Sequence, residues 1–184
     1  MATAIAAGIG PELASFAMVQ SPELRRLVDY WLGLRQGRPM PARRDVDPIA
    51  IPWALTRIYL IDYDAGSRSF RYRLAGDEIC RLFGRASLKG LALADFMPAQ
   101  TASDVESRWM ALVRKPSLMH MEGMVYLPVG RVMTGERVML PLSERGDGQV
   151  TGLIGMTVCE WHGRERPARP QRAKTTHIPV SALG

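Results

Sequence analysis

The hydrophobic pattern of the chain changes period abruptly within residues 70–84, FRYRLAGDEICRLFG. Phe70 and Tyr72 alternate with arginines, and a period of two is typical of a half-buried β-strand. After Gly76 the apolar residues follow the spacing of one helical face. The pattern therefore predicts a strand that leads directly into a short apolar helix over residues 77–83.

A longer amphipathic helix is predicted over residues 21–36, SPELRRLVDYWLGLRQ. Ser21 and Pro22 form a helix start signal, and apolar residues recur on one face. A small single-sheet domain leaves part of such a stripe uncovered, so we expect the stripe to form a homodimer interface. Its residues are Leu24, Leu27, Trp31 and Leu34.

The remaining pattern predicts an α+β fold. Prolines between Pro39 and Pro52 exclude a regular helix and predict an extended strap, residues 38–55, over the domain surface. A further helix is predicted over residues 98–115. Strand-like runs occupy residues 57–63, 69–75, 118–127, 131–142 and 150–161. This order favours an antiparallel sheet with the short helices on one face.

Length and composition favour one folded domain with extensions, because 184 residues with 47% hydrophobic side chains supply enough apolar surface for a core. We expect a flexible N-terminal segment over residues 1–20 and a folded domain over residues 21–161. Residues 162–184 are predicted to form a basic flexible tail, because prolines block regular structure and arginines repel one another.

The chain lacks the sequence features of an exported or membrane protein. Its apolar first stretch has no basic residue before Arg25 and contains glycine and proline, so it predicts neither a signal peptide nor a membrane span. Cys80 and Cys159 form no spacing pattern, which argues against a disulfide framework. We therefore expect a cytoplasmic protein without membrane contact.

The net charge of +6 raises the question of nucleic-acid binding, because clustered basic side chains neutralise phosphates. Most arginines are scattered singly, and the one local cluster lies in the proline-rich tail after residue 162. A solvated tail explains this cluster better than a groove-reading helix does. We therefore do not expect a nucleic-acid partner.

Three separated segments of the chain resemble the PAS domain family. Residues 70–98 contain the strand, glycine, short helix, GR…KG turn and DFMP box that recur in these modules. Residues 30–52 and 136–146 are similar to segments of alphaproteobacterial PAS-type proteins formerly catalogued as a domain of unknown function. The segments occur in the same order, and the resemblance covers roughly residues 22–160.

The resemblance implies a five-stranded antiparallel sheet with a cavity between the sheet and the short helices. It also implies a bacterial sensory or regulatory protein that binds a small molecule or a protein partner, and that commonly dimerises through a helix preceding the core. No kinase, cyclase or DNA-binding segment is recognisable in the remaining sequence. We therefore expect a signal to leave through protein–protein contacts.

Few residues suggest catalytic or cofactor chemistry. Cys80 superficially resembles the photoactive cysteine of flavin-binding light sensors, but the accompanying Asn and Gln are missing, so we interpret it as a small buried residue. His120 with Glu122, and Cys159 with His162, are too few ligands for a metal site, and only His120 remains a haem candidate. Hydrolase and nucleotide-binding signatures are missing. We expect no enzymatic activity and no metal, and the cofactor stays unknown.

The methionines concentrate in the predicted sheet and the adjoining helix, where they suit an adaptable cavity because methionine fills irregular space. Methionine is also an ordinary core residue, so two interpretations stay open. One is a sensor whose cavity, near the low end of roughly 300–1,000 Å³, holds a small ligand. The other is a ligand-free scaffold that pairs with other proteins. The expected ligand contacts are Cys80, Phe83, Phe96, Met97, Trp109, Met121, Met139 and Met156.

Overall fold

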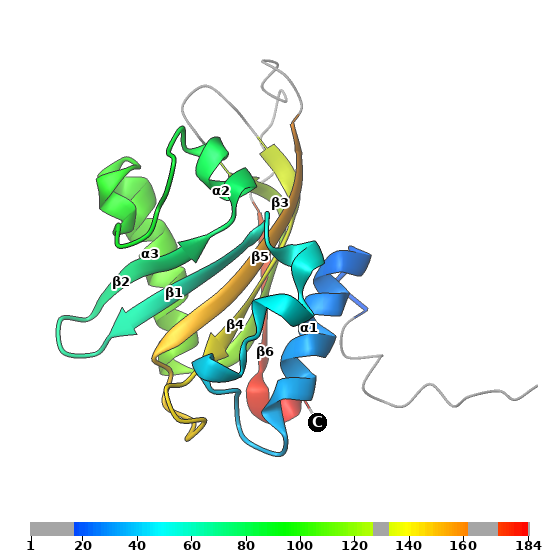
Figure 1. Cartoon of the computed structure of the whole chain (residues 1–184). Helices are drawn as coiled ribbons and strands as arrows, with labels where there is room; N and C mark the ends of the chain where they lie inside the picture. Colours follow the sequence, from blue (N-terminus) through cyan, green and yellow to red (C-terminus); the bar gives the residue numbers. More distant parts are fainter. Residues whose placement is uncertain (1–16, 127–132, 162–172, 184) are drawn as a thin grey trace, which may run out of the picture.

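The computed structural model of the chain describes residues 17–126, 133–161 and 173–183. Its centre is a six-stranded antiparallel sheet in the order β2-β1-β5-β4-β3-β6 (Figure 1). The predicted α+β class is confirmed. The strands are β1 (Ile58–Asp64), β2 (Ser69–Ala75), β3 (Ser117–Tyr126), β4 (Met133–Leu142), β5 (Gly152–Trp161) and β6 (Lys174–Pro179). The α-helices are α1 (Pro22–Arg35), α2 (Asp77–Leu82) and α3 (Ala99–Arg114).

The sheet lies between two layers. Helices α2 and α3 cover one face, and α1 together with the strap covers the other (Figure 1). On the α1 face, the indole nitrogen of Trp31 donates a hydrogen bond to the carbonyl oxygen of Pro141 in β4 at 2.9 Å. On the α3 face, Trp109 packs edge-on against Phe70 of β2, with ring centroids 5.5 Å apart. Both faces of the sheet therefore contribute to the core.

The change of period after β2 depends on Gly76. A Cβ atom at this position would lie 2.2 Å from the carbonyl oxygen of Leu55, so only glycine fits where the chain passes the strap. The Gly76 amide donates to the Ile58 carbonyl at 2.9 Å, and the Gly76 carbonyl accepts from the Cys80 amide at 3.0 Å. Gly76 therefore ends the pairing of β2 and begins α2.

The predicted dimer stripe on α1 is covered within a single chain. Leu24, Leu27 and Trp31 are 0% exposed, because α1 packs against β4 and β5. Leu34 is half-buried. The prediction of an exposed stripe is therefore wrong for the first three residues. Periodicity identified the buried face of the helix correctly, but the sheet of the same chain covers this face and a second copy does not.

The predicted five-stranded sheet and flexible tail are corrected by β6, which pairs with β3. This strand covers backbone groups that would otherwise form an exposed edge on β3. Just beyond it Leu183 is 3% exposed, and its carbonyl oxygen accepts a hydrogen bond from Arg35 Nη1 at 2.6 Å. Val19, in the segment predicted to be flexible, is 0% exposed. Residues 1–16 and 162–172 lie outside the described residues.

Candidate functional site

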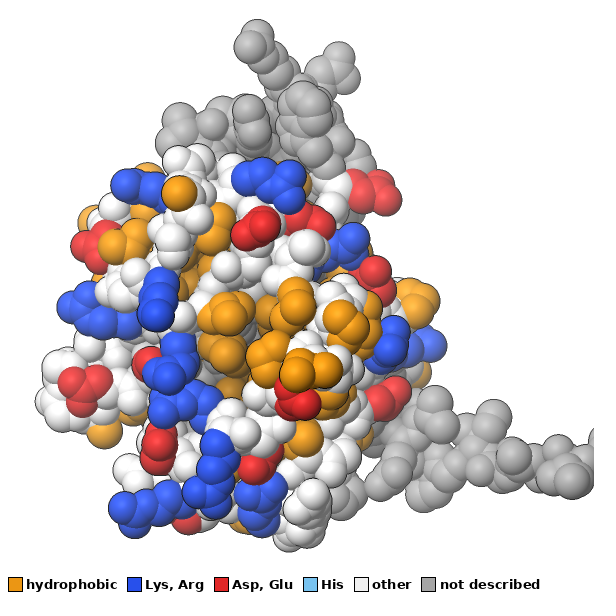
Figure 2. Space-filling view, in the orientation of Figure 1, with side chains coloured by type: hydrophobic (Ala, Val, Ile, Leu, Met, Phe, Trp, Pro, Cys, Tyr) orange, Lys and Arg blue, Asp and Glu red, His pale blue; other side chains and the backbone are white. Residues whose placement is uncertain are grey.

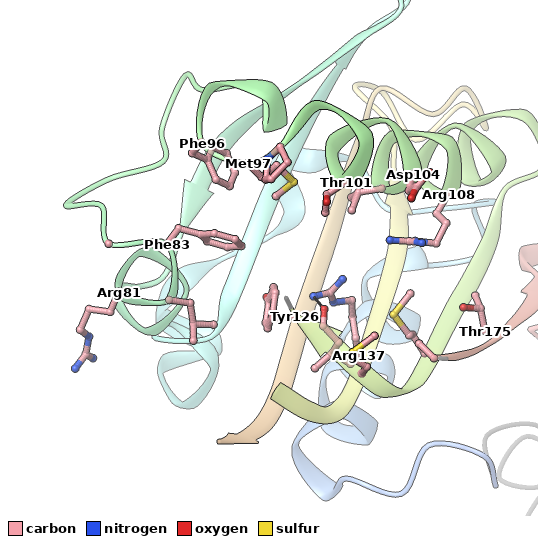
Figure 3. A pocket seen from close by; sticks show the side chains of 18 residues that line it. Arg81, Phe83, Phe96, Met97, Thr101, Asp104, Arg108, Tyr126, Arg137 and Thr175 are labelled. Atoms are coloured by element: carbon pink, nitrogen blue, oxygen red, sulfur yellow. Dashed lines mark hydrogen bonds between the residues drawn. The ribbon is translucent and has the colours of Figure 1, made fainter. Parts of the chain in front are cut away.

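A pocket of about 840 Å³ lies between the sheet and the layer formed by α2 and α3 (Figure 3). Phe83 at the end of α2 and Phe96, Met97 and Val105 near or on α3 form its helix wall. Strands β3 and β4 form the opposite wall, and β6 contributes at one end. The volume exceeds the low-end value predicted from the sequence, because side-chain packing sets a cavity volume and composition does not.

Aromatic rings form one end of the pocket. Phe83 packs edge-on against Phe96, with centroids 4.9 Å apart, and against Tyr126 of β3, with centroids 5.7 Å apart. Phe96 in turn contacts Tyr72 of β2 at 5.6 Å. Edge-to-face pairs of this kind hold the rings in fixed orientations. This end of the pocket is therefore a rigid apolar surface.

A buried arginine forms the floor of the pocket. Arg137 of β4 is 6% exposed. Its Nε donates to Thr157 Oγ1 at 2.9 Å, and its Nη2 donates to the Val125 carbonyl oxygen at 2.8 Å. The guanidinium carbon lies 4.4 Å from the centre of the Tyr126 ring, a cation–π geometry. The hydrogen bonds and the ring fix the direction of the guanidinium group.

A second arginine approaches the pocket from the helix wall. Arg108 projects from α3 toward the side of the cavity where Arg137 lies (Figure 3). Burial, followed by the positive charge of Arg137, lowers the pKa of Arg108 from its usual value, although a guanidinium stays protonated in proteins. Thr101 and Tyr126 add hydroxyl groups to the lining. The pocket thus combines an apolar end with a cationic region.

The structure brings together four of the eight residues predicted to contact a ligand. Phe83, Phe96, Met97 and Met121 line the pocket. Their role in ligand binding stays a prediction.

The other four predicted contacts belong to the core and do not line this pocket. Trp109 is packed against Phe70 and Tyr72, and the Cys80 thiol lies 3.6 Å from the Ala75 carbonyl oxygen. Met139 is 0% exposed. Met156, which pairs with Ile58 and Val138, lies on the α1 face of the sheet. Methionine content indicated the sheet but did not identify which face lines the cavity.

Sequence reasoning missed the two arginines. Arg137 precedes an apolar run in ERVMLPL, and the strand period places its side chain on the same face as Met139. A charged residue on a buried face of a central strand could therefore have been recognised from the sequence as a candidate for the site. Arg108 offered no comparable signal, because one arginine on an amphipathic helix is ordinary.

His120, the predicted haem candidate, lies on the other side of the sheet. Its Nε2 shares a 2.6 Å hydrogen bond with Glu136 Oε1, and the two side chains are buried. The Glu136 carboxylate also accepts hydrogen bonds from the amides of Gln20 and Ser21, each at 2.7 Å. His120 therefore cannot ligate a group held in the pocket. In the described ranges no three potential ligands are grouped in a way that could hold a metal ion.

Comparison with known proteins places these features in a family context. A family model described as PAS domain matches residues 19–158, a range that contains the three α-helices and strands β1 to β4. No curated protein and no solved structure gives a significant match. None of the described helices is long and apolar enough to span a membrane.

Proposed function

Because the chain belongs to the PAS domain family, we propose that it senses a small ligand bound in the pocket and signals through protein–protein contacts. Domains of this family are sensory or regulatory and are generally not catalytic. The family supports the general role. The pocket between the sheet and the α2–α3 layer is the observation that supports a ligand.

The pocket favours a sensor over a scaffold with a filled core. Its volume of about 840 Å³ lies within the range of roughly 300–1,000 Å³ typical of small-molecule sites. Its lining combines apolar and aromatic side chains with charged and hydroxyl groups, a combination that can hold a ligand and fix its orientation. A scaffold with a filled core would leave no space of this size between the sheet and the α2–α3 layer.

Native mass spectrometry of the freshly purified protein tests the proposal. We expect a small molecule to be retained reproducibly, and to be lost in Val105→Trp, where the larger ring fills the pocket. Ala111→Trp, at an exposed position of the same helix, is the matched control and should retain the molecule. A bare chain in several independent purifications, together with no stabilisation by any compound of a diverse library, would favour the scaffold instead.

A homodimer is a further part of the proposal. The strap carries the apolar residues Pro48, Ile49, Pro52, Trp53 and Leu55, which we name the strap patch. Ile49 is 86% exposed and Leu55 is 38% exposed. Apolar side chains gather on this face of the molecule (Figure 2).

The strap patch adjoins the helix that precedes the core. The Asp47 amide donates to the hydroxyl of Tyr30 in α1 at 2.8 Å, and the Arg26 guanidinium lies 4.5 Å from the centre of the Trp53 ring. The family resemblance implies dimerisation through the helix that precedes the core, and the strap patch is the exposed apolar surface beside that helix. We therefore propose that a second copy of the chain covers the strap patch. Separately, we propose that the protein is located in the cytoplasm.

A further inference from the structure

The feature of the pocket that the fold leaves unexplained is the charge of Arg137. Its side chain is buried, yet the hydrogen bonds it donates reach the neutral oxygens of Thr157 and Val125. Within the described part of the chain, no carboxylate forms an ion pair with Arg137. A buried guanidinium group without a counter-charge is destabilising, because it has lost its hydration. The pocket floor therefore carries an uncompensated positive charge.

Arg108 adds a second cation to the same cavity (Figure 3). Asp104, one turn earlier on α3, also lines the pocket, and its negative charge partly offsets the lowering of the pKa of Arg108. Its carboxylate is exposed and accepts a hydrogen bond from Gln100 Nε2 at 3.1 Å. The ion pairs of the described residues include neither Asp104 nor Arg108. Two like charges that line one cavity repel each other, and an anion between them removes the repulsion.

We propose that the pocket binds a small organic acid, with its carboxylate between Arg137 and Arg108 and its apolar body against Phe83, Phe96 and Met97. This inference rests on the proposed sensory function and names the chemistry of its ligand. The planar donor pairs of guanidinium groups match the two oxygens of a carboxylate. The aromatic end of the pocket gives the body of the acid an apolar surface of fixed shape.

The chemistry of the lining favours a carboxylate over a phosphate. A phosphate monoester carries about −1.5 to −2 charges and three acceptor oxygens, and each additional charge increases the cost of leaving water. The described lining offers Arg137 and Arg108 facing the cavity, the carboxylate of Asp104 beside Arg108, and apolar and aromatic groups at the other end. A singly charged head with an apolar body is complementary to both parts of this surface.

Isothermal titration of the full chain with three matched probes tests the inference. The probes are phenylbutyrate, its neutral amide and phenylpropyl phosphate, which share an apolar body and differ in the head group. We expect the acid to bind at least about tenfold more tightly than the amide, since tenfold corresponds to about 1.4 kcal/mol. Arg137→Met and Arg108→Met should each remove most of this preference. Arg145→Met, at an exposed position on the turn after β4, should preserve it.

Stability measurements distinguish lost binding from lost folding. Without a probe, Arg137→Met should unfold within about 5 °C of the wild type, because the loss of an uncompensated buried charge offsets the loss of the hydrogen bonds to Thr157 and Val125. A large decrease would show that the Arg137 charge is held by the fold itself as a structural group, which would overturn the inference.

The remaining outcomes separate this inference from the proposed function. Equal binding of the acid and the amide would show that the pocket does not prefer an anionic head group, which would overturn the inference but leave a ligand pocket in place. Tighter binding of the phosphate than of the acid would overturn the proposal that the head group of the ligand is a carboxylate. No binding of any probe at millimolar concentration would overturn the inference, and the proposed function would still stand if native mass spectrometry shows a retained neutral molecule.

Discussion

Tyr59 carries a buried hydroxyl group that forms no hydrogen bond of normal geometry in the described part of the chain, although the Thr157 hydroxyl is near enough to lower its pKa. An unsatisfied buried hydroxyl costs roughly 1–3 kcal/mol, so Tyr59→Phe should increase the free energy of unfolding at neutral pH by about 1 kcal/mol. Burial also raises the pKa of Tyr59 from 10.0 to about 12. The unfolded chain loses this proton at lower pH than the folded protein does, so ionisation of Tyr59 leaves stability unchanged below pH 10.0 and decreases it as pH rises toward about 12.

Urea unfolding at about pH 9 and about pH 11 measures both effects of Tyr59→Phe. The variant should lose less stability between the two pH values than the wild type does. Tyr63→Phe, on the same strand but only half-buried, is the control. A variant that is less stable than the wild type at about pH 9 would contradict the prediction, because the hydroxyl would then have a partner in the folded protein.

Glu136 ties the segment before α1 to the sheet. Its two carboxylate oxygens accept from the Gln20 and Ser21 amides and from His120. Glu136→Gln leaves one carbonyl oxygen for these donors, so we expect a loss of about 2 kcal/mol in the free energy of unfolding. Glu122→Gln, at the exposed position directly opposite on β3, should change it little. Equal effects of the two substitutions in chemical denaturation would contradict the structural role of Glu136.

At the scale of elements, β6 and the turn after it are a structural part of the domain. Leu183→Ala removes a buried side chain and should cost about 2–3 kcal/mol, which lowers the melting temperature by roughly 5–10 °C. Ser181→Ala, exposed in the same turn, should leave the temperature unchanged within about 1 °C. Differential scanning calorimetry gives both values. An unchanged melting temperature for Leu183→Ala would favour the flexible tail that the sequence predicts.

The elements that can be predicted from the sequence are those with an uninterrupted period. Strand β2 and helix α2 follow directly from FRYRLAGDEICRLFG, because glycine separates two clean patterns. Strand β6 was missed because the composition of residues 162–184 is dominated by proline and arginine. The apolar stripe of α1 was predicted correctly, but a sequence pattern indicates which face of a helix is buried and does not indicate which surface covers it. The same limit hid Arg137, whose importance depends on which groups surround it.

At the scale of the whole molecule, the strap patch predicts the oligomeric state. Ile49 is 86% exposed, so Ile49→Asp should shift a homodimer toward a monomer that keeps its native circular dichroism spectrum. Leu27→Asp should unfold the protein instead, because a charge would replace a buried leucine. Asp29→Ala, exposed on α1, is the control. Sedimentation velocity at tens of micromolar reports the state, and a monomeric wild type would remove this part of the proposal.

Strand β4 connects the two layers of the molecule through adjacent residues. Arg137 faces the pocket, while Glu136 faces the opposite side and holds the Gln20 and Ser21 amides before α1. A ligand that contacts Arg137 adds to the bonds that already hold it and should therefore also restrict β4 and the start of α1. We expect saturating phenylbutyrate to slow hydrogen–deuterium exchange in β4 and in residues 19–24, with no change in the β1–β2 turn. Glu136→Gln should remove the effect at residues 19–24 and preserve it in β4. Protection confined to the pocket side in the wild type would show that the two faces are not coupled through this strand.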